Sequence, residues 1–152
     1  MTAVPTRYFP AINISQTEMT PRIVLVAAAA LIDADGRVLL AQRPEGKNMA
    51  GLWEFPGGKV EEGERPEETL IRELHEELGI AVKEACLSPF VFASQTYETF
   101  HLLMPLYLCR RWEGAPQALE HQALAWVRPK NMNSYPMPPA DLPLIPLLRD
   151  LL

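Results

Sequence analysis

The longest apolar run of the chain extends from Ile23 to Ile32 and includes four consecutive alanines. Its length and composition predict a first long strand, with small side chains where a neighbouring layer packs closely. A membrane-spanning helix needs about twenty apolar residues, so this run is too short to cross a bilayer. A polar segment of more than twenty residues precedes it, which disfavours a secretory signal.

Other apolar stretches predict further strands, separated by segments rich in turn-forming residues. Asp35-Gly36 is a hairpin signal between two of them. The expected strands cover residues 22–33, 37–43, 80–94, 97–112 and 123–128, with a short one that begins at Trp53. A closing helix is expected from Ala140, with Pro143 near its start. We therefore expect a single domain over residues 22–152, preceded by a proline-containing arm over residues 1–21.

Residues 66–78 have the spacing of a helix with two distinct faces. At about 100° per residue, Glu73, Glu76 and Glu77 share a sector roughly a quarter-turn wide. The adjacent sector gathers the apolar side chains of Leu70, Ile71, Leu74 and Leu78. Pro66 suits the first helical turn, and Gly79 supplies a left-handed stop. One face is thus suited to the core and the other concentrates negative charge.

The acidic face is unfavourable for the helix by itself, because like charges three and four residues apart repel. One cation, Arg72, is spaced to pair with Glu76. Clustered carboxylates are the ligands that Mg²⁺ requires, usually together with substrate phosphates. A solvated acidic face is the alternative explanation of such a charge run.

A glycine segment precedes this helix. Trp53 to Gly58 is expected to form a short strand that enters a tight turn, where Gly57 and Gly58 are needed because they lack a β-carbon. Such a turn can bring a backbone carbonyl or N–H close to a phosphate or a metal ion. The order of strand, glycine turn and acidic helix favours metal binding over a solvated face.

These residues belong to one long pattern with strict spacing. Gly58 is followed after five residues by Glu64, then after seven by Arg72-Glu73-Leu74, and the pattern closes with Glu76-Glu77 and Gly79-Ile80. It resembles a complete Nudix box. The resemblance implies a Nudix fold of the α/β (α+β) class, an α/β/α sandwich around a mixed central β-sheet. It also implies Mg²⁺-dependent cleavage, with Mn²⁺ as a substitute ion, of a nucleoside diphosphate linked to another group.

Further segments resemble the MutT branch of the Nudix family, so that the resemblance covers roughly residues 22–152. These segments are Leu39 to Pro44, Gly51 to Lys59, Glu120 to Trp126 and Tyr135 to Asp141. In that branch the implied reaction is attack at the β-phosphorus, which releases a nucleoside monophosphate and pyrophosphate. No covalent enzyme intermediate is implied, and the three histidines are scattered, with no Ser or Cys beside them in the sequence.

The resemblance also implies roles at the metal. Glu64 is expected to hydrogen-bond Arg72, which holds the carboxylates in place as a fork-like donor. Glu73 is the first candidate for the general base and Glu120 the second. For Glu64 the alternative is a partner of the helix dipole, and for Glu120 an ordinary loop acid. The implied metal ligands are Gly58 through its carbonyl, Glu73, Glu76, Glu77 and the distal Glu120.

Five further residues are candidates for binding the substrate. Arg43 and Lys59 are candidate phosphate contacts, with solvation as the alternative for Lys59. Phe55 and Tyr135 are candidate walls for a base, with core packing as the alternative for Phe55. Asp141 stands where the MutT prototype carries an asparagine that reads an oxidised guanine. An ionised carboxylate only accepts hydrogen bonds, whereas burial that keeps Asp141 protonated would let it donate as well.

Two substrates therefore remain open. The first is 8-oxo-dGTP, whose hydrolysis would sanitise the nucleotide pool and protect DNA. The second is CTP or a modified pyrimidine such as 5-methyl-dCTP, because Asp141 is able to accept from the exocyclic amine of cytosine. A nucleotide-sensing Nudix module without turnover is the alternative of another class, and it is disfavoured because no box carboxylate is missing.

Composition agrees with a small enzyme for small phosphorylated substrates. The net charge of −5 leaves no basic surface for polymeric nucleic acid. Cys86 and Cys109 lack metal-type spacing, so buried free thiols are expected. The resulting expectation is a cytoplasmic protein without membrane association, as a monomer or weak homodimer.

Overall fold

The computed structural model describes residues 22–121 and 123–152, and the predicted arm over residues 1–21 lies outside this part of the chain. Two β-sheets form the framework. One sheet has the order β4-β1-β6-β5, in which β1 and β6 are parallel and the other neighbours antiparallel. Its strands are β1 (Arg22–Leu31), β4 (Gly57–Lys59), β5 (Leu87–Thr96) and β6 (Phe100–Cys109). The predicted mixed sheet is thereby confirmed.

The second sheet is smaller and fully antiparallel. Its order is β3-β2-β7. The strands are β3 (Trp53–Glu54), β2 (Val38–Gln42) and β7 (Ala123–Val127). Among the described residues the remaining elements are the helices α2 (Pro66–Leu78) and α3 (Leu144–Leu151) and two short 3₁₀ helices, η2 (Glu84–Cys86) and η3 (Pro129–Ser134).

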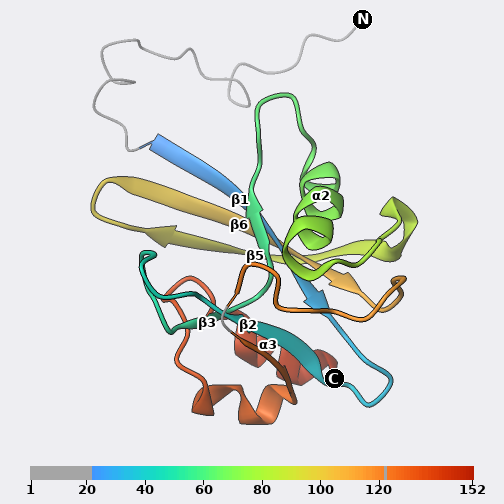
Figure 1. Cartoon of the computed structure of the whole chain (residues 1–152). Helices are drawn as coiled ribbons and strands as arrows, with labels where there is room; N and C mark the ends of the chain where they lie inside the picture. Colours follow the sequence, from blue (N-terminus) through green and yellow to red (C-terminus); the bar gives the residue numbers. More distant parts are fainter. Residues whose placement is uncertain (1–21, 122) are drawn as a thin grey trace, which may run out of the picture.

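The central strand β1 serves both faces of its sheet, because side chains alternate along a strand. Ala27, Ala29 and Leu31 pack with the apolar face of α2. Ala28 and Ala30 pack on the other face, in the cluster that contains α3. Figure 1 shows α2 (green) and α3 (red) on opposite sides of β1. The predicted α/β/α arrangement is confirmed, and the alanine run occupies the close-packed strand that its small side chains indicate.

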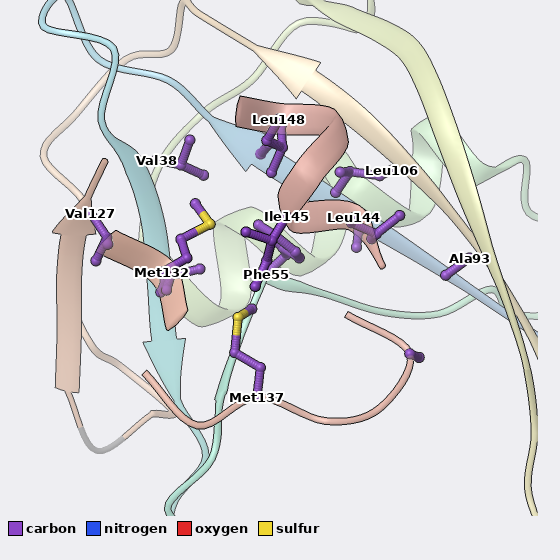
Figure 2. Packing of buried hydrophobic residues seen from close by; sticks show 14 of the residues in the cluster. Val38, Phe55, Ala93, Leu106, Val127, Met132, Met137, Leu144, Ile145 and Leu148 are labelled. Atoms are coloured by element: carbon purple, nitrogen blue, oxygen red, sulfur yellow. The ribbon is translucent and has the colours of Figure 1, made fainter. Parts of the chain in front are cut away.

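The cluster on the α3 side joins the two sheets. Leu144, Ile145 and Leu148 of α3 are buried against Leu106 of the mixed sheet and Val38 of the smaller one. Figure 2 shows these side chains converging, with Phe55 beneath Ile145. This packing fixes the strand β3, and the segment that follows it, next to the body of the protein.

Helix α2 begins and ends where the sequence indicates. Pro66 is its first residue, and the preceding Arg65 donates its backbone N–H to Oε1 of Glu68 at 3.1 Å. Gly79 adopts the left-handed conformation, with φ of 70°, and its N–H bonds the carbonyl of His75 at 3.0 Å. Both predicted helix boundaries are confirmed.

Two predicted strand features differ from the structure. Asp35-Gly36 does form a turn, with the N–H of Gly36 on the carbonyl of Asp33. However, β1 and β2 separate into different sheets after a single bridge between Ile32 and Val38. The strand expected from residue 80 begins only at Leu87, because residues 80–86 pack as a bridge and a 3₁₀ turn beside α2.

Two further observations concern the cysteines and the membrane. Cys86 and Cys109 are both free; Cys109 is buried as expected, whereas Cys86 is only partly buried. In residues 22–121 and 123–152, no helix has the length and apolar character needed to cross a bilayer.

Candidate active site

The glycine segment is a strand that touches the acidic helix. Gly57 and Gly58 belong to β4 and pair with Ala28 and Ala27 of β1, so the predicted tight turn is wrong. Glycine is required here for a different reason, which is close approach. A β-carbon on Gly57 would lie 2.8 Å from the Cα of Ala28, and one on Gly58 would lie 2.5 Å from Oε1 of Glu73. The backbone of β4 is thereby pressed directly against a box carboxylate.

This contact predicts different effects of alanine at the two glycines. In Gly58→Ala the new β-carbon meets a flexible side chain, so we expect an unfolding temperature near that of wild type. We also expect at least a roughly tenfold loss of kcat/KM, because displacing a catalytic group by about 1 Å is costly. In Gly57→Ala the clash is with backbone, so overpacking should lower the unfolding temperature. Thermal unfolding and steady-state kinetics of both variants test this, and full activity in Gly58→Ala would contradict it.

Arg72 links two carboxylates, those of Glu64 and Glu73, beside the acidic face of α2. Its Nε and Nη2 donate to the two oxygens of Glu64 at 2.8 and 3.0 Å, and its Nη1 donates to Oε1 of Glu73 at 2.8 Å. The expected Arg72–Glu64 hydrogen bond is confirmed. Glu64 also accepts from Oγ1 of Thr69 and the backbone of Glu61. Led by the Arg72 hydrogen bond, these donors lower the pKa of Glu64 to about 2, so this carboxylate is a permanently charged anchor.

Glu76 is the more open of the box carboxylates. Its Oε2 lies 3.6 Å from Nη1 of Arg72, and half of its side chain is exposed. The predicted i,i+4 pair is therefore present as a long contact. Exposed pairs of this kind contribute little to stability, which leaves the Glu76 carboxylate available for another partner.

Glu77 is buried among like charges. Only 8% of the residue is exposed, and its Oε2 lies 3.3 Å from the backbone N–H of Gly57. Desolvation, together with the charges of Glu73, Glu54 and Glu120, raises the pKa of Glu77 to about 9. A concentration of buried negative charge is the environment that a hard divalent cation neutralises.

The predicted metal ligands are partly brought together. The charges of Glu73 and Glu120 both act on Glu77, and Gly58 lies against the Glu73 side chain. Carboxylate and carbonyl oxygens are the donors that a hard divalent cation takes. Within the described residues no three acidic, histidine or cysteine side chains already converge as a complete metal site. An ion bound here would therefore need further oxygen ligands, and substrate phosphates and water commonly supply these around Mg²⁺.

A cleft of about 400 Å³ contains part of this cluster. Its polar lining includes Gly57, Gly58, Glu77 and Glu120, whereas Glu73 and Glu76 are not among its lining residues. Its apolar lining includes Phe55, Tyr97, Phe100, Leu102, Met104 and Pro138. The cleft thus combines groups suited to phosphates and metal with groups suited to a flat, apolar moiety.

Most of the predicted substrate residues reach this cleft, and one does not. Arg43, Phe55, Lys59 and Asp141 all line it. Phe55 is also part of the α3-side core, at 4% exposure. The structure does not bring Tyr135 to the lining, because its ring packs edge-on against Trp53 with centroids 5.2 Å apart. The candidates that replace it are Tyr97 and Phe100, whose rings stack at 5.0 Å.

Asp141 is a buried polar group of the cleft lining. It is 4% exposed, and burial and the charge of Glu54 raise its pKa to about 8, against the opposing effects of the Phe55 backbone N–H and of Arg43. Asp141 is thus protonated at neutral pH. A carboxylic acid both donates and accepts a hydrogen bond, as the side-chain amide of an asparagine does.

Sequence reasoning missed Glu54, which lines the cleft and acts electrostatically on both Glu77 and Asp141. Its Oε2 accepts from Nη1 of Arg43 at 2.8 Å, and its Oε1 lies 3.2 Å from Nε2 of His121. Arg43 also donates from Nε to the carbonyl of Asn48 at 2.7 Å, so its guanidinium is already engaged by the protein. The signal that marks Glu54 in the sequence is an acid between two aromatic residues in a short strand.

The histidines are less scattered than the sequence suggests. His101 bridges the hairpin of β5 and β6, with Nε2 at 2.6 Å from Oγ of Ser94 and Nδ1 at 2.9 Å from Oγ1 of Thr96. A Ser–His contact therefore exists, although none is adjacent in sequence. The contact is exposed and neither residue lines the cleft described above, so it lies outside the candidate active site.

The fold and the cleft together define a Nudix-type hydrolase. The chain belongs to the NUDIX domain family, whose model matches residues 27–147. Members of this family are generally dependent on divalent metal ions.

Similar proteins fall in the MutT-type group. The chain is 45% identical over 124 residues to a CTP pyrophosphohydrolase of Escherichia coli, covering 80% of this chain and 89% of that protein. It is 37% identical over 134 residues to an 8-oxo-dGTP diphosphatase of Haemophilus influenzae, covering 84% of this chain and 92% of that protein. The solution structure of the E. coli ORF135 protein matches with a TM-score of 0.75 and 39% identity, over 86% of this chain and 91% of that one.

Proposed function

We propose that the protein is a Mg²⁺-dependent nucleoside triphosphate pyrophosphohydrolase that releases a nucleoside monophosphate and pyrophosphate. The observation that supports this most is one cleft with two chemically different sets of lining groups. The buried carboxyl of Glu77 lines it together with Glu120, and the buried acid Asp141 lines it together with aromatic side chains. A nucleotide is bipolar in the same way, with a triphosphate at one end and a base at the other.

The carboxylates are proposed to hold the ion. Glu73, Glu76, Glu77 and Glu120, with the Gly58 carbonyl, are the proposed ligands. When bound, a divalent ion neutralises phosphate charge and lowers the pKa of a coordinated water. Arg72 holds Glu73 through Oε1, which leaves Oε2 of Glu73 to take a proton from the attacking water. Glu120 is the second candidate for that role.

The base is proposed to bind against the apolar lining residues and Asp141. Because Asp141 is protonated at neutral pH, it can donate and accept on adjacent atoms of a base edge. We propose 8-oxo-dGTP as the principal substrate, with nucleotide-pool sanitation as the role; 8-oxo-dGTP diphosphatases are among the relatives. CTP or a modified pyrimidine is the second candidate, supported by the 45% identity to a CTP pyrophosphohydrolase.

We also propose the domain organisation, the oligomeric state and the cellular location of the protein. Residues 22–152 act as a single domain on a small nucleotide, as a monomer or weak homodimer in the cytoplasm. The similarity to bacterial enzymes named for small nucleotide substrates supports the substrate class.

Steady-state kinetics with Mg²⁺ on 8-oxo-dGTP, dGTP, CTP and 5-methyl-dCTP test the proposal. We expect pyrophosphate as the product, and a kcat/KM for 8-oxo-dGTP on the order of 10² or more above that for dGTP, since a hydrogen-bonding site discriminates strongly. Higher values for both cytosine nucleotides would select the second candidate. Turnover of none of the four, or turnover undiminished in Glu76→Gln, would contradict the proposed mechanism.

A further inference from the structure

One face of the mixed sheet is only partly covered by α2. Side chains alternate along a strand, and Ala27, Ala29 and Leu31 of β1 pack with α2. Ile23 and Leu25, at the start of β1, therefore point to the same side of the sheet. In Figure 1 the start of β1 (blue) and the hairpin of β5 and β6 (yellow) extend beyond α2. Part of this face of the sheet thus lies outside the cover of the helix.

The strand register extends this uncovered part across three strands. Leu25 of β1 pairs with Leu103 of β6. Two residues further along β6, Pro105 pairs with Phe92 of β5. Side chains of directly paired residues lie on the same side of a sheet, so these apolar groups form one continuous surface. We call it the open sheet face, and it consists of Ile23, Leu25, Phe92, Leu103 and Pro105.

The open sheet face is apolar and exposed to solvent. Phe92 is 66% exposed and Ile23 is 64% exposed, and the other three residues are partly exposed. Pro105 aside, none of the five belongs to or packs against either buried cluster within residues 22–121 and 123–152. Contiguous exposed apolar side chains of this kind commonly mark an interaction surface.

The sequence that leads into β1 has the chemistry to cover this face. No charged residue lies between Arg7 and Glu18. Within this stretch, Ile12 and Ile14 alternate with polar residues. In an extended chain the two isoleucine side chains would therefore share one side. The arm over residues 1–21 thus contains an uncharged segment with an apolar side.

The point of attachment and the length of the arm also suit the open sheet face. The first described residue, Arg22, is adjacent to Ile23 of this face. Crossing from β1 over β6 to β5 covers two strand spacings, which is about 10 Å. The chain between Ile14 and Arg22 can extend to about 25 Å. Because a short covalent connection gives a high effective concentration, the arm is favoured over a second copy of the chain.

We propose that residues 8–16 pack on the open sheet face of the same molecule, with Ile12 and Ile14 in contact with it. The packed arm would support the strands that form the cleft. Phe100, Leu102 and Met104 of β6 line the cleft from the opposite side of the same sheet, so the arm restrains the wall that is proposed to contact the base. The packing itself does not depend on the function proposed above.

A double substitution in the full chain tests this packing. We expect Ile12→Asp/Ile14→Asp to lower the unfolding temperature by roughly 5 °C, because two apolar side chains lose their buried area. Amide hydrogen exchange in β5 and β6 should also become faster. Ala3→Asp/Val4→Asp adds the same charge outside residues 8–16, and this matched control should change neither property. An arm that contacts nothing cannot affect them, so a wild-type unfolding temperature and exchange pattern in Ile12→Asp/Ile14→Asp would overturn the inference.

NMR and sedimentation of the wild type identify what covers the face. The methyl groups of Ile12 and Ile14 should show nuclear Overhauser effects to those of Leu25 and Leu103 in a monomeric protein, and their absence would contradict the proposal. A second copy on this face would instead give a dimer that Phe92→Asp dissociates and Ile12→Asp/Ile14→Asp leaves intact. That pattern would also overturn the inference. None of these measurements uses turnover, so failure of the proposed function would appear separately, as absence of hydrolysis.

Discussion

Replacing Glu77 by glutamine is expected to remove nearly all turnover while leaving the metal-free protein at least as stable as wild type. The substitution removes the buried negative charge that we propose to bind the cation, and a metal ion supplies several kcal/mol of charge stabilisation. A loss of kcat/KM on the order of 10³ follows, because about 1.4 kcal/mol corresponds to a factor of ten. The glutamine oxygen can still accept from the N–H of Gly57, which lies 3.3 Å from Oε2 in the wild type.

The stability effect has a defined sign. Burial and neighbouring carboxylates raise the pKa of Glu77 from 4.5 to about 9. The folded state therefore holds a proton that the unfolded state has lost, and the metal-free wild type loses stability as pH rises through this range. The free energy of unfolding of Glu77→Gln should therefore not fall over this pH range as that of the wild type does.

Urea unfolding in the presence of a chelator, at several pH values, measures the effect of Glu77→Gln. Glu76→Gln is the matched control for the loss of one box carboxylate, because the Glu76 side chain is half exposed whereas Glu77 is buried. A Glu77→Gln protein that is much less stable than wild type at pH 9 would show that the buried charge stabilises the fold instead of straining it.

Asp141 is expected to act at neutral pH as a carboxylic acid. Asp141→Asn keeps one donor and one acceptor, so we expect its kcat/KM at pH 7 to remain within roughly tenfold of wild type. Asp141→Ala removes both, and a buried hydrogen-bonding site that loses its contact discriminates by several orders of magnitude. A loss on the order of 10³ is expected for the alanine variant.

The pH profile distinguishes the acid from the amide. The pKa of Asp141 is raised from 3.8 to about 8, by burial first and the charge of Glu54 second, with Arg43 opposing. Tyr97 is the other titratable group that senses Asp141. The wild-type kcat/KM should therefore fall above about pH 8, and Asp141→Asn should not show this fall.

The stability of the wild type should respond to Asp141 in the same direction. A raised acid pKa contributes stability at low pH that is lost as pH rises from about 4 to about 8. Asp141→Asn should thus unfold at a higher temperature than wild type at pH 9. Wild-type activity that increases through pH 8 for the cytosine nucleotides would show instead that the ionised carboxylate is the functional form.

Elements whose signals are local in the sequence were predictable. Helix α2 begins at Pro66 and ends before Gly79 as expected, because a first-turn proline and a left-handed glycine act within a few residues. The alanine run was predictable as a close-packed strand for the same reason, since small side chains in an apolar run indicate close packing without reference to distant residues.

Elements that depend on distant partners were not predictable. The glycines of β4 were assigned to a turn, whereas their close neighbours, Ala28 and Glu73, come from a strand and a helix elsewhere in the chain. The contact between Glu54 and His121 joins residues 67 positions apart in the sequence, so no rule based on sequence spacing predicts it. Tyr135 lies in a segment that resembles the base-binding segment of the MutT branch. Its position against Trp53 depends on tertiary packing, which the sequence pattern does not show.

The position of Glu54 implies that ion affinity and base preference are thermodynamically linked. Its charge raises the pKa of Glu77, a proposed metal ligand, and the pKa of Asp141, a proposed base contact. A cation that compensates this charge eases the ionisation of both acids, and by reciprocity a base that favours one form of Asp141 changes the affinity for the cation. The selectivity of the cleft between bases should therefore vary with the concentration of free divalent ion. A substitution at Glu54 cannot adjust one of these properties without shifting the other.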